Sequence, residues 1–160
     1  MKILGIDPGL VQTGFGIISI SKDIFNLIDY GVIKPDPKDD LSYRLLTIHQ
    51  DVKSIIDNYS PTAVAIEDIF YGKNIKSALK LGQARGAAMV ASAAYKLPIF
   101  EYSARKVKQA ITGNGNATKE QLQFMVKTIL NLQSLPSPID ASDALAIAIC
   151  HCQQFRENDL

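Results

Sequence analysis

The first apolar segment of the chain, residues 3–6, contains no polar side chain. An uninterrupted apolar run is typical of a strand that is covered on both faces of a sheet. The run ends on Asp7, after which a proline and a glycine turn the chain. Further strands are predicted at 15–20 and 24–33, joined by a short polar turn, so the chain should begin with an antiparallel meander.

Farther along the chain, helical and strand patterns alternate. Residues 40–58 carry apolar side chains at three- and four-residue steps, which predicts an amphipathic helix. Residues 63–67 form a short apolar strand that ends, like the first one, on an acid, Glu67. An alanine-rich helix is predicted at 75–95, and a strand at 97–102 follows it.

Three helices complete the pattern. They are expected at 104–111, from a capping box at Thr118-Lys-Glu-Gln121 to about 131, and from 140 to about 154. The order β-β-β-α-β-α-β-α-α-α predicts an α/β fold in which a five-stranded mixed sheet has helices on both faces. Since neither repeats nor a linker interrupt it, residues 1–160 are expected to form a single domain.

The composition, 47% apolar and 21% charged, is that of a soluble globular protein. No apolar run approaches the roughly 18 residues of a membrane span, and no cleavable signal pattern opens the chain. We therefore expect a cytoplasmic protein. Cys150 and Cys152 flank His151, but residues two apart on a helix point in different directions, so buried thiols are expected rather than a zinc site.

Positive charge is concentrated in the middle of the chain. Residues 73–127 hold 10 basic and 2 acidic side chains, whereas residues 1–72 hold 6 basic and 10 acidic ones. A basic segment of this size favours a polyanionic partner such as nucleic acid. Charge alone fits a solvated helix surface equally well.

Two strands end on carboxylates, Asp7 and Glu67. If these strands pair in parallel, both acids lie at the same end of the sheet, where α/β folds place their sites. Gly5, Ala63 and Ala65 precede the acids on the same strand faces, so another element should pack closely there. The glycines after the first acid are expected to turn the chain and to leave room for ions and a phosphate.

The last predicted helix supplies two more acids. Asp140 and Asp143 recur at helical spacing beside small residues, so docking this helix on the sheet would bring four carboxylates together. Like charges about 4 Å apart repel by roughly 4 kcal/mol per pair at an effective dielectric of 20. Oxygen-only ligands suit Mg²⁺ or Mn²⁺, and two such ions can promote phosphodiester hydrolysis. The pattern therefore predicts metal-assisted phosphoryl transfer on a nucleic acid.

Each acid also has a simpler interpretation. Asp140 could cap the last helix, Asp143 could interact with the helix dipole, and Glu67 could be a solvated strand end. Asp7 fits such an interpretation least, because it directly follows an apolar strand.

Several segments, taken in order, resemble one known family. They are Ile6-Asp7-Pro8-Gly9 with Thr13-Gly14, Ala65-Ile66-Glu67, Lys73-Asn74, Ser77-Ala-Leu-Lys-Leu-Gly-Gln-Ala-Arg-Gly86, Glu101-Tyr102, Val107-Lys108-Gln109 and Asp140-Ala-Ser-Asp143-Ala-Leu-Ala-Ile-Ala148. Together they are similar to the RuvC family of bacterial Holliday junction resolvases. The resemblance runs from about residue 3 to residue 152.

The resemblance implies a ribonuclease H-like fold, a homodimer, and Mg²⁺-dependent paired nicking of four-way DNA junctions in recombination and repair. It also implies the RuvA–RuvB branch-migration complex as a partner. The family's metal-binding acids fall on Asp7, Glu67, Asp140 and Asp143. Its junction-contacting aromatic residue falls on Phe70, and its catalytically important lysines fall on Lys108 and Lys119.

Other basic residues are expected to contact DNA together with these two lysines: Lys76, Lys80, Arg85 and Arg105. The alanine-rich helix at 75–95 would allow the close approach of a second helix, which suits a two-fold dimer contact. For His151, a structural role is favoured over that of a general base.

Two other functions remain open. Ile6-Asp7-Pro8-Gly9 with Thr13-Gly14 also resembles the phosphate loop of actin-like and sugar-kinase proteins, so the chain could be one half of a nucleotide-binding ATPase. A DNA-binding module of the same fold that does not cut is the third option.

Overall fold

The computed structural model describes residues 1–69, 72 and 74–158, and the side chains of residues 1–155 within those ranges. These residues form five strands and five helices in the order expected from the sequence. They are β1 (Lys2–Asp7), β2 (Thr13–Ser21), β3 (Ile24–Ile33), α1 (Leu41–Tyr59), β4 (Ala63–Glu67), α2 (Ile75–Ala94), β5 (Ile99–Tyr102), α3 (Ala104–Thr112), α4 (Lys119–Ile129) and α5 (Ile139–Asn158).

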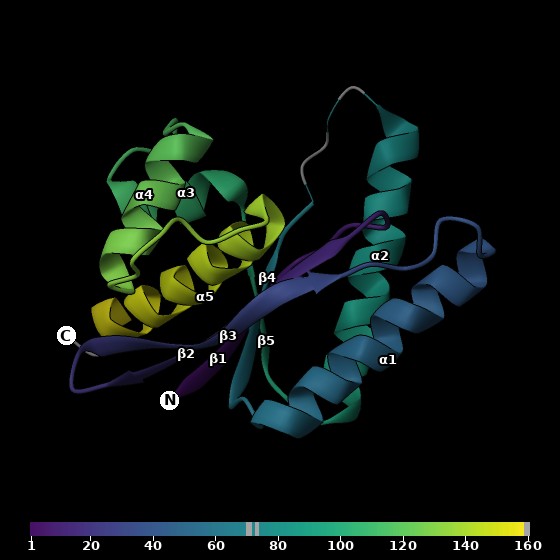
Figure 1. The fold of residues 1–160 in the computed structure, drawn as a ribbon, viewed down its shortest axis with the longest axis horizontal. Helices are drawn as coiled ribbons and strands as arrows, with labels where there is room; N and C mark the ends of the chain where they lie inside the picture. Colours follow the sequence, from purple (N-terminus) through teal and green to yellow (C-terminus); the bar gives the residue numbers. More distant parts are fainter. Residues whose placement is uncertain (70–71, 73, 159–160) are drawn as a thin grey trace.

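The strands form one mixed sheet in the order β3-β2-β1-β4-β5. The first three strands are antiparallel neighbours, whereas β4 runs parallel to both β1 and β5. In Figure 1, α1 and α2 cover one face of the sheet, and α3, α4 and α5 lie on the other. The predicted five-stranded mixed sheet with helices on both faces is therefore confirmed.

Strand β1 shows why the first apolar run has no polar interruption. Ile3 is buried in the core beneath α5, whereas Leu4 and Ile6 are buried in the core beneath α1 and α2. Because side chains alternate between the two faces of a strand, both sets of positions must be apolar when both faces are covered.

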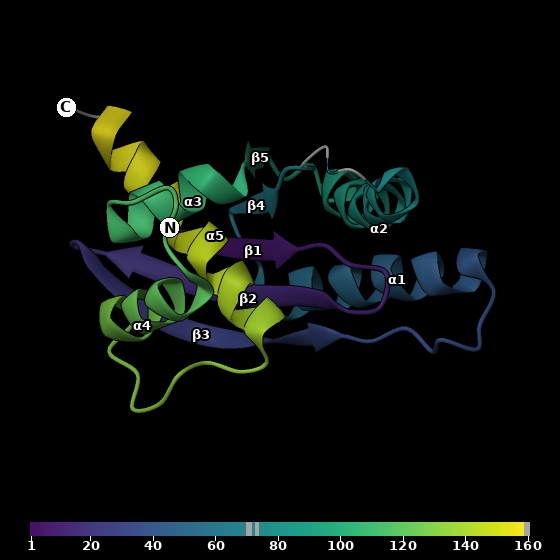
Figure 2. The same ribbon diagram turned by 90° about the horizontal axis from the view of Figure 1, so that it is seen from above.

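Helix α5 crosses the sheet at very short range, directly over β1 and β2 (Figure 2). A Cβ atom built at Gly5 would overlap the backbone carbonyl oxygen of Ala144, and one at Gly14 would overlap the carbonyl oxygen of Asp140. Ala148 is the next small contact along the helix. The sheet can hold the backbone of α5 at this distance only because these positions lack side chains.

This packing corrects one expectation about the glycines after the first acid. Gly14 does not belong to the turn, because β2 already begins at Thr13 and Gly14 pairs with Asp7 in the antiparallel register. Its missing side chain makes room for the first turn of α5. Turning the chain falls to the preceding residues, where the Thr13 hydroxyl donates to the Gly9 carbonyl oxygen at 2.8 Å.

Two smaller expectations are also resolved. The capping box is present, since Thr118 Oγ1 accepts from the Gln121 backbone and the Gln121 side chain accepts from the Thr118 backbone. Cys150 and Cys152 are both buried, as expected for core thiols. Among the helices of the described residues, none has the length and apolarity that a membrane span needs.

His151 is part of this core. Its side chain is buried, and Nδ1 lies 2.8 Å from the Tyr102 hydroxyl. The rings of Phe100 and Phe155 pack on the imidazole at centroid distances of 4.4 and 4.7 Å. Burial lowers its pKa from 6.5 to about 4, so the imidazole is neutral in the folded protein at pH 7.

We expect a Gly14→Ala substitution to destabilise the protein, because the new methyl group would overlap a backbone atom of α5 rather than a flexible side chain. The free energy of unfolding should fall by roughly 3 kcal/mol, the upper part of the range for overpacking. Urea unfolding followed by circular dichroism measures it. Gly86→Ala is the control, since a Cβ there meets nothing within 4 Å and should leave stability unchanged or raised. Equal stability of Gly14→Ala and the wild type would contradict this packing.

His151 should also make stability depend on pH. Its lowered pKa contributes stability that is complete above about pH 6.5 and is lost as the pH falls towards 4. The stability difference between the wild type and His151→Gln, which cannot titrate, should therefore shrink by roughly 3 kcal/mol between pH 7 and 4. Urea unfolding of both proteins across this range tests it, and a constant difference would show that His151 is not held neutral.

Candidate active site

A cavity of about 650 Å³ opens where β1 and β4 end and α5 begins. Helices α3 and α4 close its other side. The cavity is lined by polar and apolar side chains from all five elements: Asp7, Glu67, Ala104, Val107, Lys108, Lys119, Leu122, Asp140, Asp143 and Ile147. The four acids and the two lysines that the sequence singled out as catalytic therefore share one cavity.

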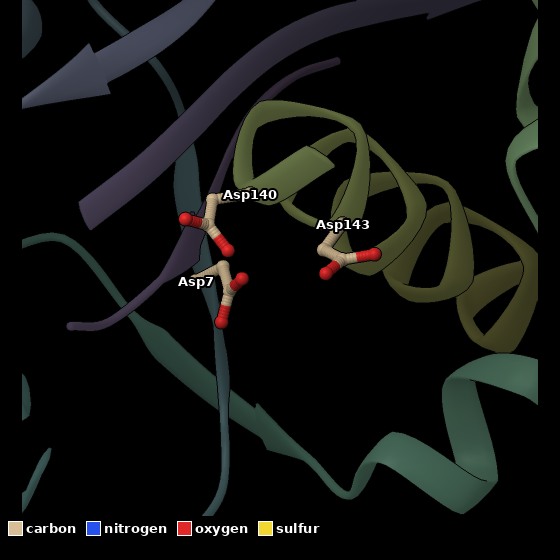
Figure 3. A group of neighbouring side chains, drawn as sticks. All are labelled: Asp7, Asp140 and Asp143. Atoms are coloured by element: carbon tan, nitrogen blue, oxygen red, sulfur yellow. The ribbon is translucent and has the colours of Figure 1, made fainter. Parts of the chain in front are cut away.

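Three of the acids are close neighbours. Asp7 comes from the end of β1, and Asp140 and Asp143 come from the first turns of α5 (Figure 3). Each offers a carboxylate oxygen, and these three atoms lie within 4.8 Å of one another. The three-residue spacing places both helix acids on one side of α5, and the contact over Gly14 brings that side to Asp7.

Glu67 completes the group from the end of β4. Ile6 and Ile66 are parallel register partners, so the acids that follow them lie side by side at one end of the sheet. The Asp7 and Glu67 carboxyl groups share the cavity, and Glu67 is close enough to help raise the pKa of Asp7. The expectation that two parallel strands bring their terminal acids together is confirmed.

The capping interpretation of Asp140 does not fit this geometry. Because α5 begins at Ile139, Asp140 lies inside the first turn and is not the N-cap. Its carboxylate accepts a hydrogen bond from the side-chain amide of Gln12. Asp143 forms an ion pair with Lys119, whose Nζ lies 3.9 Å from Asp143 Oδ2.

Burial and mutual repulsion shift the proton affinity of the acids. The pKa of Asp7 rises from 3.8 to about 10, first because the group is buried and then because Glu67, Asp143 and Asp140 surround it. The pKa of Asp143 rises to about 6, mainly through burial, although Lys119 acts in the opposite direction. Because Asp7 retains its proton at neutral pH, a bound cation could take the place of that proton. The donors of the acid cluster are all carboxylate oxygens, the ligands that Mg²⁺ and Mn²⁺ prefer, so the residues fit a divalent ion.

The loop between α3 and α4, which leads to Lys119, is stapled by hydrogen bonds of the Gln109 side chain. The side-chain amide of Gln109 donates to the Gly113 carbonyl oxygen at 3.1 Å and accepts from the Gly115 backbone at 3.0 Å. This staple holds the loop that leads to α4, and Lys119 is the first residue of that helix. Lys108, one position before the staple, reaches the cavity from α3.

Other residues expected to contact DNA lie outside the cavity. Lys76 and Lys80 are exposed on the first half of α2. Arg105 is exposed on α3, where its Nη1 donates to Asn116 Oδ1 at 3.1 Å. Phe70, the expected junction-contacting aromatic residue, lies outside the described residues.

Arg85 differs from these residues. Its side chain is only 12% exposed, and its guanidinium contacts acceptors on β4, β5 and the segment after β4. Since this side chain is enclosed by its own fold, it offers little surface to a DNA phosphate, which argues against the expected DNA contact.

Sequence reasoning missed Gln12 and Gln109. Gln109 lies within a segment that resembles the family and Gln12 lies between two of them. An amide that orients an acid 128 positions away, or one that holds a loop, leaves no periodic pattern. His151 faces the aromatic core described above and is not among the residues that line the cavity, which agrees with a structural role.

Comparison with known proteins identifies the family. The model of the family "Crossover junction endodeoxyribonuclease RuvC" matches residues 3–151. The chain belongs to the RuvC family. It is 52% identical over 151 residues to RuvC of Geotalea uraniireducens, an alignment that covers 94% of this chain and 88% of that protein.

Solved RuvC structures agree with the fold. The Thermus thermophilus RuvC structure superposes with a TM-score of 0.92 at 35% identity, covering 99% of this chain and 97% of that one. A second structure, T. thermophilus RuvC in complex with Holliday junction substrate, gives a TM-score of 0.93 at 35% identity, covering 99% and 96%. The RuvC match confirms the expected ribonuclease H-like fold, and it does not favour the alternative of a nucleotide-binding ATPase half.

The raised pKa of Asp7 predicts the effect of removing its titratable carboxyl group. That shift contributes stability that is complete below about pH 3.8 and is lost as the pH rises towards 10. At pH 8 in a chelator, Asp7→Asn should therefore melt at a higher temperature than the wild type, because asparagine need not take up a proton on folding, by roughly 2–4 °C for each kcal/mol of stability regained. The gain should disappear near pH 4.

Differential scanning calorimetry in chelator and in Mn²⁺ measures this effect. Asp39→Asn is a matched control, because Asp39 is exposed and is not among the residues that line the cavity. Added Mn²⁺ should raise the melting temperature of the wild type and of the control, but not that of Asp7→Asn. A lower melting temperature for Asp7→Asn in chelator would show that the cluster does not repel itself.

Proposed function

We propose that this chain is an endodeoxyribonuclease that resolves four-way DNA junctions by paired, symmetric hydrolysis of phosphodiester bonds in recombination and repair. The observation that carries this proposal is the cavity in which four acids face two lysines, in a chain of the RuvC family. The related T. thermophilus RuvC, solved with a Holliday junction substrate, supports a four-way junction as the DNA that is cut.

We propose that Asp7, Glu67, Asp140 and Asp143 hold Mg²⁺, two ions per site, and that Mn²⁺ can replace it. Bound divalent ions would lower the pKa of the attacking water and offset the charge that builds up on the phosphate. The acid cluster supports this assignment, because a cation would offset both the burial and the repulsion that otherwise keep Asp7 protonated. Gln12 would orient one carboxylate oxygen of Asp140 in the same site.

The lysines on the opposite side of the cavity act on the phosphate. The Lys119 side chain is 61% exposed, so it can leave Asp143 and reach a DNA strand that enters the cavity. Lys108 stands beside it on α3. Both ammonium groups would hold the scissile phosphate and stabilise the negative charge that develops on its oxygens.

The surrounding surface would hold the arms of the junction. Lys76 and Lys80 on α2 and Arg105 on α3 are exposed, and we propose that they contact backbone phosphates. Phe70 follows Glu67 by three positions, so its ring would stack on or wedge beside an unpaired base near the cleavage point.

A homodimer would provide two such cavities for two strands. Helix α2 supports this proposal, because Ile75, Leu79 and Val90 are 74%, 63% and 62% exposed along it. Together with Ile69 and Gly82, the first two of these side chains line an apolar hollow that a second copy could cover. We further propose that residues 1–160 act as a single domain in the cytoplasm and, by family likeness, together with a RuvA–RuvB complex.

The remaining candidate is a DNA-binding module of the same fold that does not cut. A module of this kind has no need for four acids in one cavity, since carboxylates repel the DNA backbone. The complete acid set therefore supports cleavage.

Asp7→Asn separates the two candidates. With Mg²⁺ and a labelled four-way junction, the wild type should give paired nicks at symmetric positions, and its products should ligate without trimming. Asp7→Asn should bind the junction but cut it at least about 100-fold more slowly, since loss of a ligand should cost no less than loss of an outer partner. Asp39→Asn should cut like the wild type. Cleavage by Asp7→Asn at a rate near that of the wild type would refute the proposed site.

A further inference from the structure

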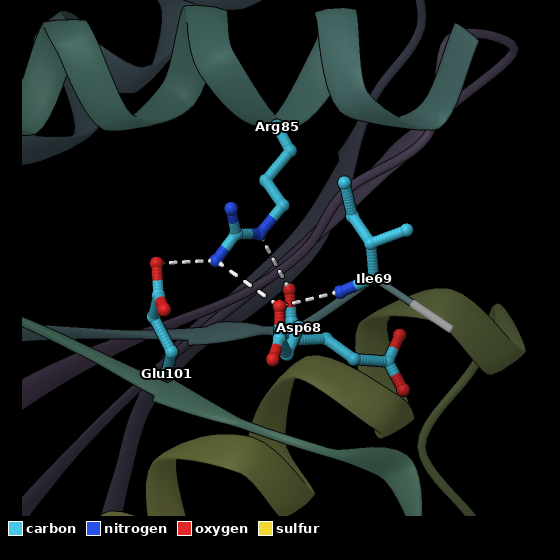
Figure 4. Close-up of polar contacts among 5 residues, drawn as sticks. Asp68, Ile69, Arg85 and Glu101 are labelled. Atoms are coloured by element: carbon cyan, nitrogen blue, oxygen red, sulfur yellow. Dashed lines mark hydrogen bonds and ion pairs between the residues drawn. The ribbon is translucent and has the colours of Figure 1, made fainter. Parts of the chain in front are cut away.

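Arg85 joins three elements on the face of the sheet opposite α5 (Figure 4). From α2, its Nε donates to the Glu67 carbonyl oxygen at 3.0 Å, and its Nη2 donates to Glu101 Oε1 on β5 at 2.5 Å. The same Nη2 lies 3.7 Å from Asp68 Oδ1. The guanidinium is therefore fixed between the end of β4, the next residue along the chain, and β5.

The peptide that follows Glu67 is held on both sides. Its N–H, which belongs to Asp68, donates to the Tyr102 carbonyl oxygen at 2.8 Å. Its C=O, which points the opposite way in a planar trans peptide, accepts from Arg85. The β1–β4 register ends one residue earlier, at Ile66. Arg85 thus contacts the strand end where the sheet pairing between β1 and β4 has stopped.

Only an arginine fits this arrangement. Its planar group presents Nε to the carbonyl oxygen and Nη2 to the carboxylates at the same time, which one ammonium group cannot do in this geometry. Glu101 faces the same side, because its register partner Ile66 is buried beneath α1 and α2. The guanidinium is shielded, whereas its acidic partners face solvent. The Arg85 side chain is only 12% exposed, and those of Asp68 and Glu101 are 53% and 46% exposed.

The Glu67 side chain lies on the other face of the sheet, in the cavity with Asp7. Because a backbone atom and the side chain of one residue move together, a tether on the Glu67 carbonyl limits where its carboxylate can lie. A misplaced ligand weakens a metal site even when the ligand itself is unchanged.

We propose that Arg85 is a positioning residue of the metal site, which holds the end of β4 so that the Glu67 carboxylate stays beside Asp7. This inference rests on the proposed function, because it assigns Glu67 as a metal ligand. Helix α2 would then help to position a ligand of the site, although no residue of α2 lines the cavity.

The test compares Arg85→Gln, Arg85→Lys and the control Lys96→Gln. Lys96 is an exposed residue just after α2, so its variant removes one positive charge without touching the network. Two measurements are made on each protein. The first is the rise in melting temperature on adding Mn²⁺ without DNA, and the second is the Mg²⁺ concentration that half-saturates single-turnover cleavage of a four-way junction.

For Arg85→Gln, we expect the half-saturating Mg²⁺ concentration to increase by about 10- to 100-fold, the usual effect of losing an outer partner of a metal ligand. Its Mn²⁺-induced rise in melting temperature should shrink, and its affinity for the junction in Ca²⁺ should match the wild type. Arg85→Lys keeps the positive charge, so its stability in chelator should exceed that of Arg85→Gln. Its half-saturating Mg²⁺ concentration and its Mn²⁺-induced rise in melting temperature should both remain impaired. Lys96→Gln should behave as the wild type.

Other results would overturn the proposal. Unchanged metal responses in Arg85→Gln would show that the tether does not affect the site, and weaker junction binding with normal metal responses would make Arg85 a DNA contact instead. If Arg85→Gln does not fold, Glu101→Gln, which changes an exposed partner of the network, should show a smaller loss in the same direction, and its absence would count against the proposal. A wild type that takes up Mn²⁺ without cutting junctions would refute the proposed function alone, since the measurement without DNA still decides the role of Arg85.

Discussion

The contact on which the site depends is the one between the backbone of α5 and the glycines of the sheet. Gly5 and Gly14 lie where a methyl group would collide with the carbonyl oxygens of Ala144 and Asp140. Helix α5 can therefore rest directly on β1 and β2, and two acids of its first turns reach the acid that ends β1. Any larger side chain at these positions would separate the carboxylates, whatever their spacing along the chain.

The same contact imposes an electrostatic cost that other parts of the fold must balance. Bringing buried carboxylates together raises the pKa of Asp7 to about 10 and that of Asp143 to about 6. Lys119 offsets part of this from α4, which a capped first turn and the Gln109 staple hold in place. Rigid elements on three sides thus maintain an arrangement that the acids by themselves would disfavour, as is common where function sets the geometry.

What the sequence could predict follows from the range of each interaction. The spacing of apolar residues and the residues at strand ends predicted the sheet and its terminal acids. They also predicted a close-packed element over Gly5. These signals are readable because they are local or repeat regularly. The role of Gly14 was misjudged, since a glycine beside a turn looks like part of the turn until the register with Asp7 is known. Gln12, Gln109 and Arg85 act through specific hydrogen bonds of their side chains, Gln12 and Arg85 to distant groups and Gln109 to the backbone of its own loop, and no periodic pattern along the chain encodes such partners.

The site also draws on both layers of helices, although its cavity opens on only one of them. On the α5 side, packing against glycine sets the positions of Asp140 and Asp143. On the α2 side, Arg85 holds the carbonyl of Glu67, whose side chain projects to the opposite face. Because the pairing of β4 with β1 stops at Ile66, the contact with Arg85 gives the end of β4 a second support. In the proposed metal site, a residue beneath the sheet would therefore influence the geometry above it without touching a metal or DNA.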